Sequence, residues 1–318
     1  MKRTRDNRVP LSSALPLSTP FVINVDPSSA CDFKCKYCFQ SKGDMPTKGT
    51  MQWSTYKRVI KQMGEFDKPI KTLRLYAFGE PLLNPNFAKM VQHAKENGVC
   101  DDVDTTTNAS RLTPELSRCL INAGLDRINI SIVGVNSDQY KEFSDVSLDF
   151  DKLVENIAYL YSIKKQCTVF IKINGDVISS KDKLRFRGIF ELISDGIAIE
   201  HVMSCWDGIE VEKNKHFSVY GGSLTKVEVC PYIFYSMCVN FDGVVSACFL
   251  DWNRKLVIGN TNKNTLKEIW DGPAMLSYRR DMLLKKRHLI PVCKDCDQLR
   301  AGEPVNIDHM AEKLLRTI

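Results

Sequence analysis

Three cysteines stand close together in the string CDFKCKYC, at positions 31, 35 and 38. They follow a short apolar run, FVINV at positions 21–25, which predicts a strand that ends just before the loop. Three thiolates on one loop suit an iron–sulfur cluster, because a closed structural zinc site takes four protein ligands. The sequence therefore predicts that Cys31, Cys35 and Cys38 hold a cluster with one iron open to a further ligand. The alternative is a zinc site that borrows a remote fourth ligand.

The spacing C-x-x-x-C-x-x-C, with the aromatic Tyr37 before the last cysteine, resembles the signature loop of the radical S-adenosylmethionine (SAM) superfamily. The resemblance implies an enzyme with a 4Fe-4S cluster whose open iron chelates the amino and carboxylate groups of SAM. One electron from the cluster would cleave SAM to methionine and a 5′-deoxyadenosyl radical, which removes a hydrogen atom from the substrate. It also implies that Tyr37 contacts SAM.

Strands and helices alternate regularly over residues 21–204, which we expect to form the core domain. The expected strands are 21–25, 72–78, 102–107, 127–133, 169–174 and 197–202, and the expected helices lie near 54–65, 86–97, 113–123, 151–164 and 181–194. Repeated βα units with apolar strands predict an α/β fold with a parallel sheet covered by helices. Six such units resemble the partial (β/α)6 TIM-like barrel of the radical SAM core.

Chemistry in parallel α/β barrels gathers at the C-terminal ends of the strands. Gly79 and Glu80, in AFGEPLL, follow the second expected strand and resemble the G-G-E-P motif of the family, with Phe78 in place of the first glycine. Glycine permits a close backbone approach, and a carboxylate or carbonyl would face the SAM ammonium group. The resemblance implies that Gly79 and Glu80 bind SAM.

Two further polar residues follow the next strands. Asn108, in DTTTNAS, resembles the asparagine of a T-N-G pattern, with Ala109 in place of the glycine, and Ser131, in INISIVG, resembles a serine near the SAM ribose or carboxylate. The alternative for both is a polar residue that caps the next turn. Lys172 and Asn174, on the fifth strand, receive no predicted role.

A second group of cysteines lies near the C-terminus. The segment from Cys230 to Cys248 predicts a hairpin around Asp242-Gly243, a dipeptide favoured in tight turns because both positions tolerate positive φ. The hairpin would make Cys230 and Cys248 neighbours, and the pair Cys293 and Cys296 follows some 45 residues later. A zinc ribbon is the alternative for four cysteines so spaced.

The same region resembles the auxiliary-cluster domain called SPASM, through Gly243, the tripeptide at 258–260, the LKEIW run at 266–270 and the late C-x-x-C. No cysteine follows Cys296, so the resemblance is to the shortened, twitch form. It implies one auxiliary 4Fe-4S cluster ligated by Cys230, Cys248, Cys293 and Cys296, and therefore two 4Fe-4S clusters in all. Cys205 and Cys238 are expected to be structural thiols, with substitution as a ligand as the alternative.

A fully ligated auxiliary cluster suggests an oxidoreductase, because the radical left after hydrogen abstraction must lose a second electron. Shortened-domain relatives include dehydrogenases of aminocyclitol alcohols, so we expect a sugar, nucleotide sugar or aminocyclitol as substrate. The alternative is a peptide-modifying maturase or epimerase of the ribosomal-peptide or sulfatase-maturing type. The first strand begins near residue 21, which leaves no room for the N-terminal peptide-recognition domain of many such relatives.

Composition limits the partners and the location. The 318 residues carry a formal net charge of +6 that is spread along the chain, and the short basic run KKRH at 285–288 is interpreted as a solvated face rather than a nucleic-acid site. No stretch approaches the roughly 18 apolar residues of a membrane span. Twelve cysteines without an export signal favour metal binding in a reducing cytoplasm. We expect a small-molecule substrate and a flavodoxin- or ferredoxin-type electron donor, with no nucleic acid and no membrane.

The expected organisation has five parts: an N-terminal leader at 1–20, the radical SAM core at 21–204, a linker and substrate loop at 205–229, the auxiliary domain at 230–300 and a C-terminal helix at 301–318. The substrate pocket should lie in the C-terminal mouth of the barrel. From the linker we propose four lining residues, which are Trp206, Asp207, His216 and Tyr220.

Overall fold

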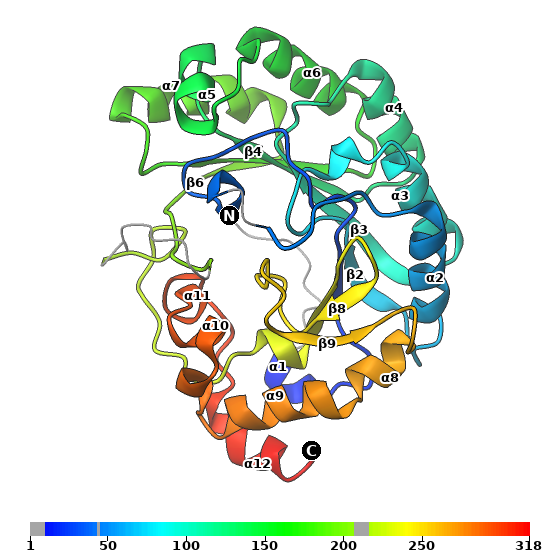
Figure 1. Cartoon of the computed structure of the whole chain (residues 1–318). Helices are drawn as coiled ribbons and strands as arrows, with labels where there is room; N and C mark the ends of the chain where they lie inside the picture. Colours follow the sequence, from blue (N-terminus) through cyan, green and yellow to red (C-terminus); the bar gives the residue numbers. More distant parts are fainter. Residues whose placement is uncertain (1–9, 43–44, 207–215) are drawn as a thin grey trace.

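The computed structural model describes residues 10–42, 45–206 and 216–318 (Figure 1). Within them one sheet of nine strands curves through the molecule without closing, in the order β6-β5-β4-β3-β2-β1-β7-β8-β9. The strands are β1 (Val22–Val25), β2 (Ile70–Arg74), β3 (Cys100–Thr107), β4 (Arg127–Ile132), β5 (Thr168–Asn174), β6 (Gly196–Glu200), β7 (Ser236–Val239), β8 (Val244–Ser246) and β9 (Val257–Asn260).

Strands β1 to β6 are parallel and in sequence order, which makes this part of the sheet the predicted partial (β/α)6 barrel. Long helices cover its outer face (Figure 1). They are α2 (Trp53–Met63), α3 (Phe87–Glu96), α4 (Pro114–Asn122), α6 (Phe150–Ile163) and α7 (Ser180–Phe190). The fold class expected from the sequence is confirmed.

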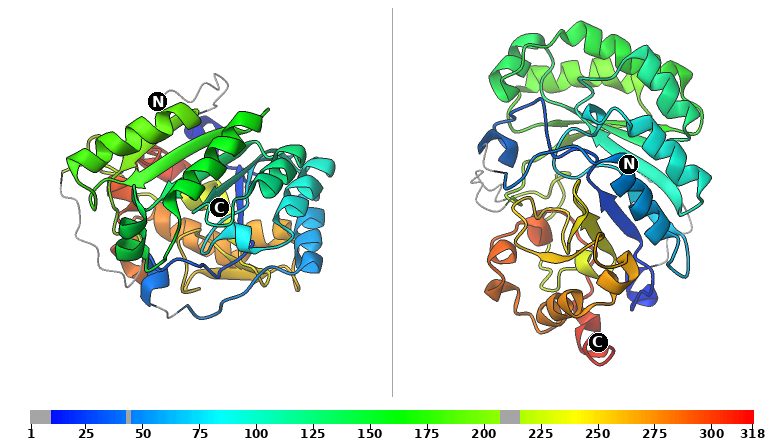
Figure 2. Two further views of the ribbon diagram at one scale, coloured as in Figure 1. Left: turned by 90° about the horizontal axis from the view of Figure 1, so that it is seen from above. Right: turned by 45° about the vertical axis from the view of Figure 1, so that its right-hand side comes forward.

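The C-terminal hairpin continues the barrel sheet. Strand β7 pairs with β1 in parallel, with Asn24 opposite Cys238, and β8 and β9 then add antiparallel strands at that edge. The segment from β7 onward therefore packs against the β1 side of the barrel (Figure 2). This pairing fixes the second group of cysteines relative to the first, because β1 leads directly into the loop that carries Cys31.

Helices also flank β7 to β9, and α8 and α9 lie below these strands in the view of Figure 1. The flanking helices are α8 (Leu266–Trp270), α9 (Pro273–Leu283), α10 (Pro291–Lys294), α11 (Gln298–Ala301) and α12 (Ala311–Leu315). Helix α8 starts with a capping box, in which Thr265 and Glu268 bond each other's backbone N–H groups. The buried Arg279 of α9 donates to the carbonyls of Ile233 and Trp270, so it ties α9 to α8 and to the start of the hairpin.

Four local details differ from the sequence expectations. Strand β2 ends at Arg74 rather than at residue 78, and a helix that was not expected, α5 (Ser137–Ser144), follows β4. In the hairpin turn only Gly243 takes positive φ, at 88°. Asp242 does not, because four residues lie between the ends of β7 and β8 instead of the two of a tight hairpin turn. The expected C-terminal helix is helical only as α12 and the end of α11.

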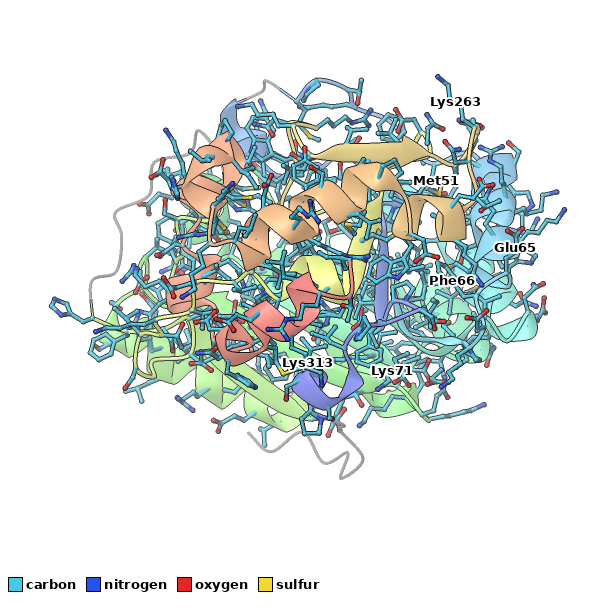
Figure 3. All side chains as sticks on the ribbon, turned by 90° about the horizontal axis from the view of Figure 1, so that it is seen from below. Met51, Glu65, Phe66, Lys71, Lys263 and Lys313 are labelled. Carbon is cyan, nitrogen blue, oxygen red and sulfur yellow. The ribbon has the colours of Figure 1, made fainter. Side chains whose placement is uncertain are left out.

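The remaining short elements are the helix α1 (Leu11–Ala14) and the 3-10 turns η1 (Phe39–Lys42), η2 (Pro81–Leu83), η3 (Glu191–Ile193), η4 (Tyr232–Phe234), η5 (Arg287–Leu289) and η6 (Asp308–Met310). Figure 3 shows the lower face, where Lys71, Lys263 and Lys313 are exposed while Met51 and Phe66 are buried. In the described part of the chain, no helix combines the length and the apolar character that crossing a membrane requires.

Candidate functional site

The loop after β1 brings three thiols together. Cys31, Cys35 and Cys38 are free and half-buried, and the Phe33 N–H donates to the Cys31 sulfur at 3.4 Å. Burial raises the pKa of Cys31 to about 12, and the charges of Glu80, Asp32 and Cys38 add to the effect. Such thiols become thiolates only beside a cation. An iron–sulfur cluster would supply that positive charge, so the donor set fits the group that the loop implies.

Asp32 fastens this loop to the end of β3. Its carboxylate accepts hydrogen bonds from the Asn108 amide at 3.0 Å, from the Ser110 hydroxyl at 2.7 Å and from Arg111 Nε at 3.2 Å. The Asn108 amide nitrogen also lies 3.9 Å from the Cys31 sulfur. The predicted site residue Asn108 is therefore next to the cysteine loop and holds it in position.

Gly79 is where the GEP segment meets the cysteine loop. A Cβ atom built on Gly79 would lie 2.2 Å from the Ala30 carbonyl oxygen and 2.3 Å from that of Ser28. The next N–H, of Glu80, donates to the same Ala30 oxygen at 2.9 Å. Only glycine permits this approach, because backbone atoms cannot rotate away.

The Glu80 carboxylate points into the protein. It accepts hydrogen bonds from the Thr107 hydroxyl at 2.6 Å, the Asn108 N–H at 2.7 Å and the Leu82 N–H at 3.0 Å. Burial raises the pKa of Glu80 to about 7, although all three donors favour its charged form. The carboxylate is therefore engaged by the chain itself. We expected either a carboxylate or a backbone carbonyl of this segment to face the SAM ammonium group, and the backbone carbonyls remain for that role.

The two departures from the family pattern have structural reasons. Phe78 is buried and packs edge-on against Phe39, with ring centroids 6.2 Å apart. Its ring thus fills space between the GEP segment and the cysteine loop. Ala109 has φ of +60°, the conformation that the glycine of a T-N-G pattern suits, so alanine occupies this position at the cost of backbone strain.

A pocket of about 240 Å³ opens at the C-terminal ends of β4, β5 and β6. Its lining unites the predicted residues Tyr37 and Ser131 with side chains that follow β6. The lining residues are Tyr37, Ser131, Ile132, Lys172, Ile173, Asn174, Glu200, His201, Val202, Met203, Cys205, Trp206 and Val219. Of the four linker residues proposed from the sequence, Trp206 lines this pocket, His216 and Tyr220 are exposed outside its lining, and Asp207 lies outside the described residues.

Sequence reasoning missed the polar centre of this pocket. Lys172 Nζ forms an ion pair with Glu200 Oε2 at 3.0 Å, and Asn174 Nδ2 is buried without a hydrogen-bond partner. Burial opposes the charge of Lys172, but Glu200 outweighs it and raises the pKa of the lysine. Position was the available signal: Asn174 and Glu200 are the last residues of β5 and β6, and Lys172 lies two residues before the end of β5.

The second group of cysteines also converges. Desolvation contributes most to the raised pKa of the half-buried Cys248, and the thiolate charges of Cys230, Cys296 and Cys293 each raise it further. These four sulfurs come from the two ends of the hairpin and from α10 and its C-terminal end. The described residues thus contain two separate groups of thiols, one after β1 and one drawn from the ends of the hairpin and from the region of α10.

The thiols within each set lie near enough to influence one another's charge. In the described parts of the chain, no group of three or more His, Cys, Asp or Glu residues is arranged to hold a metal ion.

Aromatic side chains fill the space between the two cysteine groups. Phe39, next to Cys38, stacks on Trp252 with ring centroids 5.1 Å apart and meets Trp206 at 4.8 Å. Cys238 is buried in the same cluster, away from the second group of thiols, whereas Cys205 lines the pocket and is influenced by both Cys296 and Cys38. Cys238 is thus placed as a structural thiol and Cys205 as a thiol of the pocket.

Comparison with protein families gives two matches. The radical SAM superfamily model matches residues 25–176, and the model of the iron–sulfur cluster-binding domain SPASM matches residues 230–297. Among curated proteins, a GTP 3′,8-cyclase of Crocosphaera subtropica is 32% identical, over 83% of this chain and 89% of that protein. A SAM-dependent 2-deoxy-scyllo-inosamine dehydrogenase of Niallia circulans is 23% identical, over 91% of this chain and 97% of that protein. Other curated relatives, including further GTP 3′,8-cyclases, are matched over only 40 to 46% of their own length.

Two solved structures show the same fold. BtrN in complex with AdoMet and 2-DOIA has a TM-score of 0.60 at 20% identity, over 87% of this chain and 92% of that chain. SuiB of Streptococcus suis bound to the precursor peptide SuiA has a TM-score of 0.66 at 15% identity, over 90% of this chain and 73% of that chain.

Proposed function

Because the chain belongs to the radical SAM superfamily and carries a SPASM-type iron–sulfur domain, we propose that it oxidises a small polar substrate, an aminocyclitol, sugar or nucleotide sugar. We further propose that it binds two 4Fe-4S clusters, the first at Cys31, Cys35 and Cys38 and the second at the four later cysteines. With SAM bound, the first cluster supplies a carbon-centred radical that removes one hydrogen atom from the substrate.

The pocket beside the cysteine loop carries this proposal. It places polar side chains of β5 and β6 beside the predicted SAM contacts Tyr37 and Ser131, so a small polar substrate held there would lie next to SAM. The buried Asn174 Nδ2 lacks an acceptor, and Lys172 and Glu200 offer a cation and an anion 3.0 Å apart. Such groups suit hydroxyl and amine substituents on a ring.

We assign different roles to the polar residues of the pocket. Asn174 donates to a substrate hydroxyl, and Lys172 holds the Glu200 carboxylate in position. After the hydrogen atom has left, the remaining hydroxyl or amine must lose a proton, and Glu200 is the carboxylate that lines the pocket to accept it. The four later cysteines would hold a cluster able to take the remaining electron. The dehydrogenase of Niallia circulans supports this proposal, because its sequence similarity to this chain spans both domains of the chain.

A peptide-modifying activity is the second candidate. The fold is also shared with SuiB, whose solved complex holds a precursor peptide, and the Cys205 thiol lines the pocket where it could return a hydrogen atom to a substrate radical. An oxidation needs no such donor. Cys205→Ser should therefore leave product formation intact in the proposed oxidoreductase and abolish turnover in an epimerase.

Iron content and SAM cleavage test the two cluster sites together. Anaerobically reconstituted protein should bind about eight iron atoms. Cys35→Ala should abolish cleavage, whereas Cys293→Ala should retain uncoupled cleavage without product. Cys119→Ala is the matched control, because Cys119 is exposed on α4. Equal losses in both variants would mean that the second site is structural.

The substrate class is tested by a panel that holds 2-deoxy-scyllo-inosamine, nucleotide sugars, GTP and a peptide. GTP belongs in the panel because a GTP 3′,8-cyclase is among the relatives. An aminocyclitol or sugar that raises 5′-deoxyadenosine formation supports the proposal. Turnover with GTP or peptide alone would refute it.

A further inference from the structure

A histidine and a carboxylate form a pair in the wall of the pocket of about 240 Å³. His201 lines this pocket, and its Nδ1 lies 2.6 Å from Asp176 Oδ1. The second oxygen of Asp176 accepts a hydrogen bond from the Val202 N–H at 2.8 Å. Because a carboxylate only accepts hydrogen bonds, the imidazole donates its Nδ1 proton to Asp176. Within the part of the chain that the structure describes, the other ring nitrogen, Nε2, has no hydrogen-bond partner.

The chain holds this pair in place from several sides. The His201 N–H donates to the Val219 carbonyl at 2.8 Å, and the imidazole stacks on Phe217 with ring centroids 5.7 Å apart. The Asp176 N–H donates at 2.9 Å to the side-chain oxygen of Asn174, which lines the same pocket. The pair is therefore built into the pocket wall, and its ring is oriented there.

Two of the described side chains that line the pocket are of a type that accepts a proton at neutral pH, the Glu200 carboxylate and the His201 imidazole. Burial raises the pKa of the Cys205 thiol to about 12 and also raises the pKa of the Tyr37 hydroxyl, so both groups keep their protons. Burial opposes the charge of Lys172, but the Glu200 carboxylate raises its pKa, so the lysine stays protonated as well. A proton that leaves Glu200 through the pocket wall thus has His201 as its acceptor.

The two acceptors differ in their access to water. The Glu200 side chain is 17% exposed and pairs with Lys172, whereas the side chains of His201 and Asp176 are 28% and 36% exposed. Strand β6 is the edge strand of the sheet, and His201 follows its last residue, Glu200 (Figure 1). His201 is therefore the neighbour of the carboxylate that reaches both the pocket and the solvent.

We propose that His201 carries to water the proton that Glu200 takes from the substrate, with Asp176 as the positioning residue that holds its ring. The proposal rests on the proposed function, in which the substrate loses a hydrogen atom, an electron and a proton. The substrate O–H or N–H bond breaks as its proton moves to Glu200. This proton then moves to His201 Nε2, directly or through one water molecule, and the imidazolium releases it to water. Both side chains return to their starting forms, so this route consumes no further reactant.

The variant His201→Asn separates this role from a structural one. An asparagine amide takes the place of Nδ1 and can still donate to Asp176, but it offers nothing in place of Nε2 that binds a proton. With 2-deoxy-scyllo-inosamine, SAM and dithionite, we expect kcat for substrate oxidation to fall on the order of 100-fold, while KM changes less than twofold. His309→Asn is the matched control, because His309 is exposed on η6, and it should change neither constant more than twofold.

The first turnover tests the order of the two proton transfers. With the protein in excess over SAM, His201→Asn should form product at the rate of the unaltered protein, because Glu200 still takes one proton. Glu200→Gln should lose this first turnover as well. Nitrogen-15 NMR of the unaltered protein at pH 8 gives a readout that needs no substrate, and the His201 signals are identified by their absence in His201→Asn. The ring should carry its proton on Nδ1 and none on Nε2.

A proton on Nε2 at this pH overturns the proposal, because this nitrogen could not accept another. So does a kcat of His201→Asn within twofold of the unaltered value, which would make the pair a structural contact. Loss of the first turnover in this variant also overturns it, since His201 would then act on the substrate itself. A protein that oxidises no aminocyclitol or sugar refutes the proposed function, and the proton route with it. If oxidation proceeds and His201→Asn is fully active, only the proton route fails.

Discussion

Replacing Gly79 by alanine should disable the cysteine loop. The added Cβ would lie 2.2 Å from the Ala30 carbonyl oxygen, which is 0.8 Å short of the 3.0 Å that real Cβ contacts respect. Because the Ala30 and Ser28 atoms in its way are backbone, the loop must shift by at least this amount. Ala30 directly precedes Cys31, so the shift passes to a proposed cluster ligand.

The expected effect has two parts. Overpacking should cost about 1–3 kcal/mol of unfolding free energy. A displacement of nearly 1 Å at the reacting centre should lower SAM cleavage on the order of 100-fold. Iron per chain after anaerobic reconstitution and the rate of 5′-deoxyadenosine formation with dithionite measure both parts.

A matched glycine provides the control. A Cβ on Gly188, in helix α7, meets nothing within 4 Å. Gly188→Ala should therefore raise the unfolding free energy by about 0.5–1 kcal/mol and leave cleavage unchanged. If Gly79→Ala binds full iron and cleaves SAM within twofold of the unaltered rate, the argument from close backbone approach is refuted.

Three further predictions concern stability. Burial raises the pKa of Asp26 from 3.8 to about 7, so its stabilising contribution is complete below pH 4 and is lost as the pH rises through 7. Asp26→Asn should remove this loss of unfolding free energy, which is roughly 4 kcal/mol at most. If the substitution changes the melting temperature equally at pH 5 and at pH 8, the prediction is contradicted. Ala109→Gly relieves the strain of a φ of +60° and should raise the unfolding free energy by about 0.5–1 kcal/mol. Ala94→Gly, inside α3, should lower it by about 1 kcal/mol or more. A lower unfolding free energy in both variants would show that Ala109 is unstrained. Thr265→Ala removes the N-cap of α8 and should cost about 1 kcal/mol in chemical unfolding, and no change would mean that tertiary packing alone holds the helix.

Much of the barrel could be predicted from local pattern. Apolar runs and helix caps placed five of the six parallel strands to within about two residues at either end, because each segment carries its own periodicity. The second strand was predicted to run to residue 78, but it ends at Arg74. Beyond it the chain is held by Gly79 against the Ser28–Ala30 backbone, a contact between distant segments that no local pattern contains.

The parts that could not be predicted depend on pairing over long separations. Strand β7 joins β1 across more than 200 residues, so the hairpin extends the barrel sheet instead of standing apart. The Glu80 carboxylate points into the protein because its hydrogen-bond donors lie near residue 107. Likewise, the place of Lys172 in the pocket depends on its ion pair with Glu200. The role of such a residue can be recognised only once the position of its partner in the fold is known.

Hydrogen transfer from substrate to SAM tests the central claim most directly. The reconstituted protein is incubated with SAM, dithionite and 2-deoxy-scyllo-inosamine carrying deuterium on its ring carbons, and 5′-deoxyadenosine is analysed by mass spectrometry. We predict one deuterium in 5′-deoxyadenosine, together with a substrate that has lost two hydrogens. Unlabelled 5′-deoxyadenosine with this substrate and with every deuterated sugar of the panel, or label only from a deuterated peptide, would contradict the proposed function.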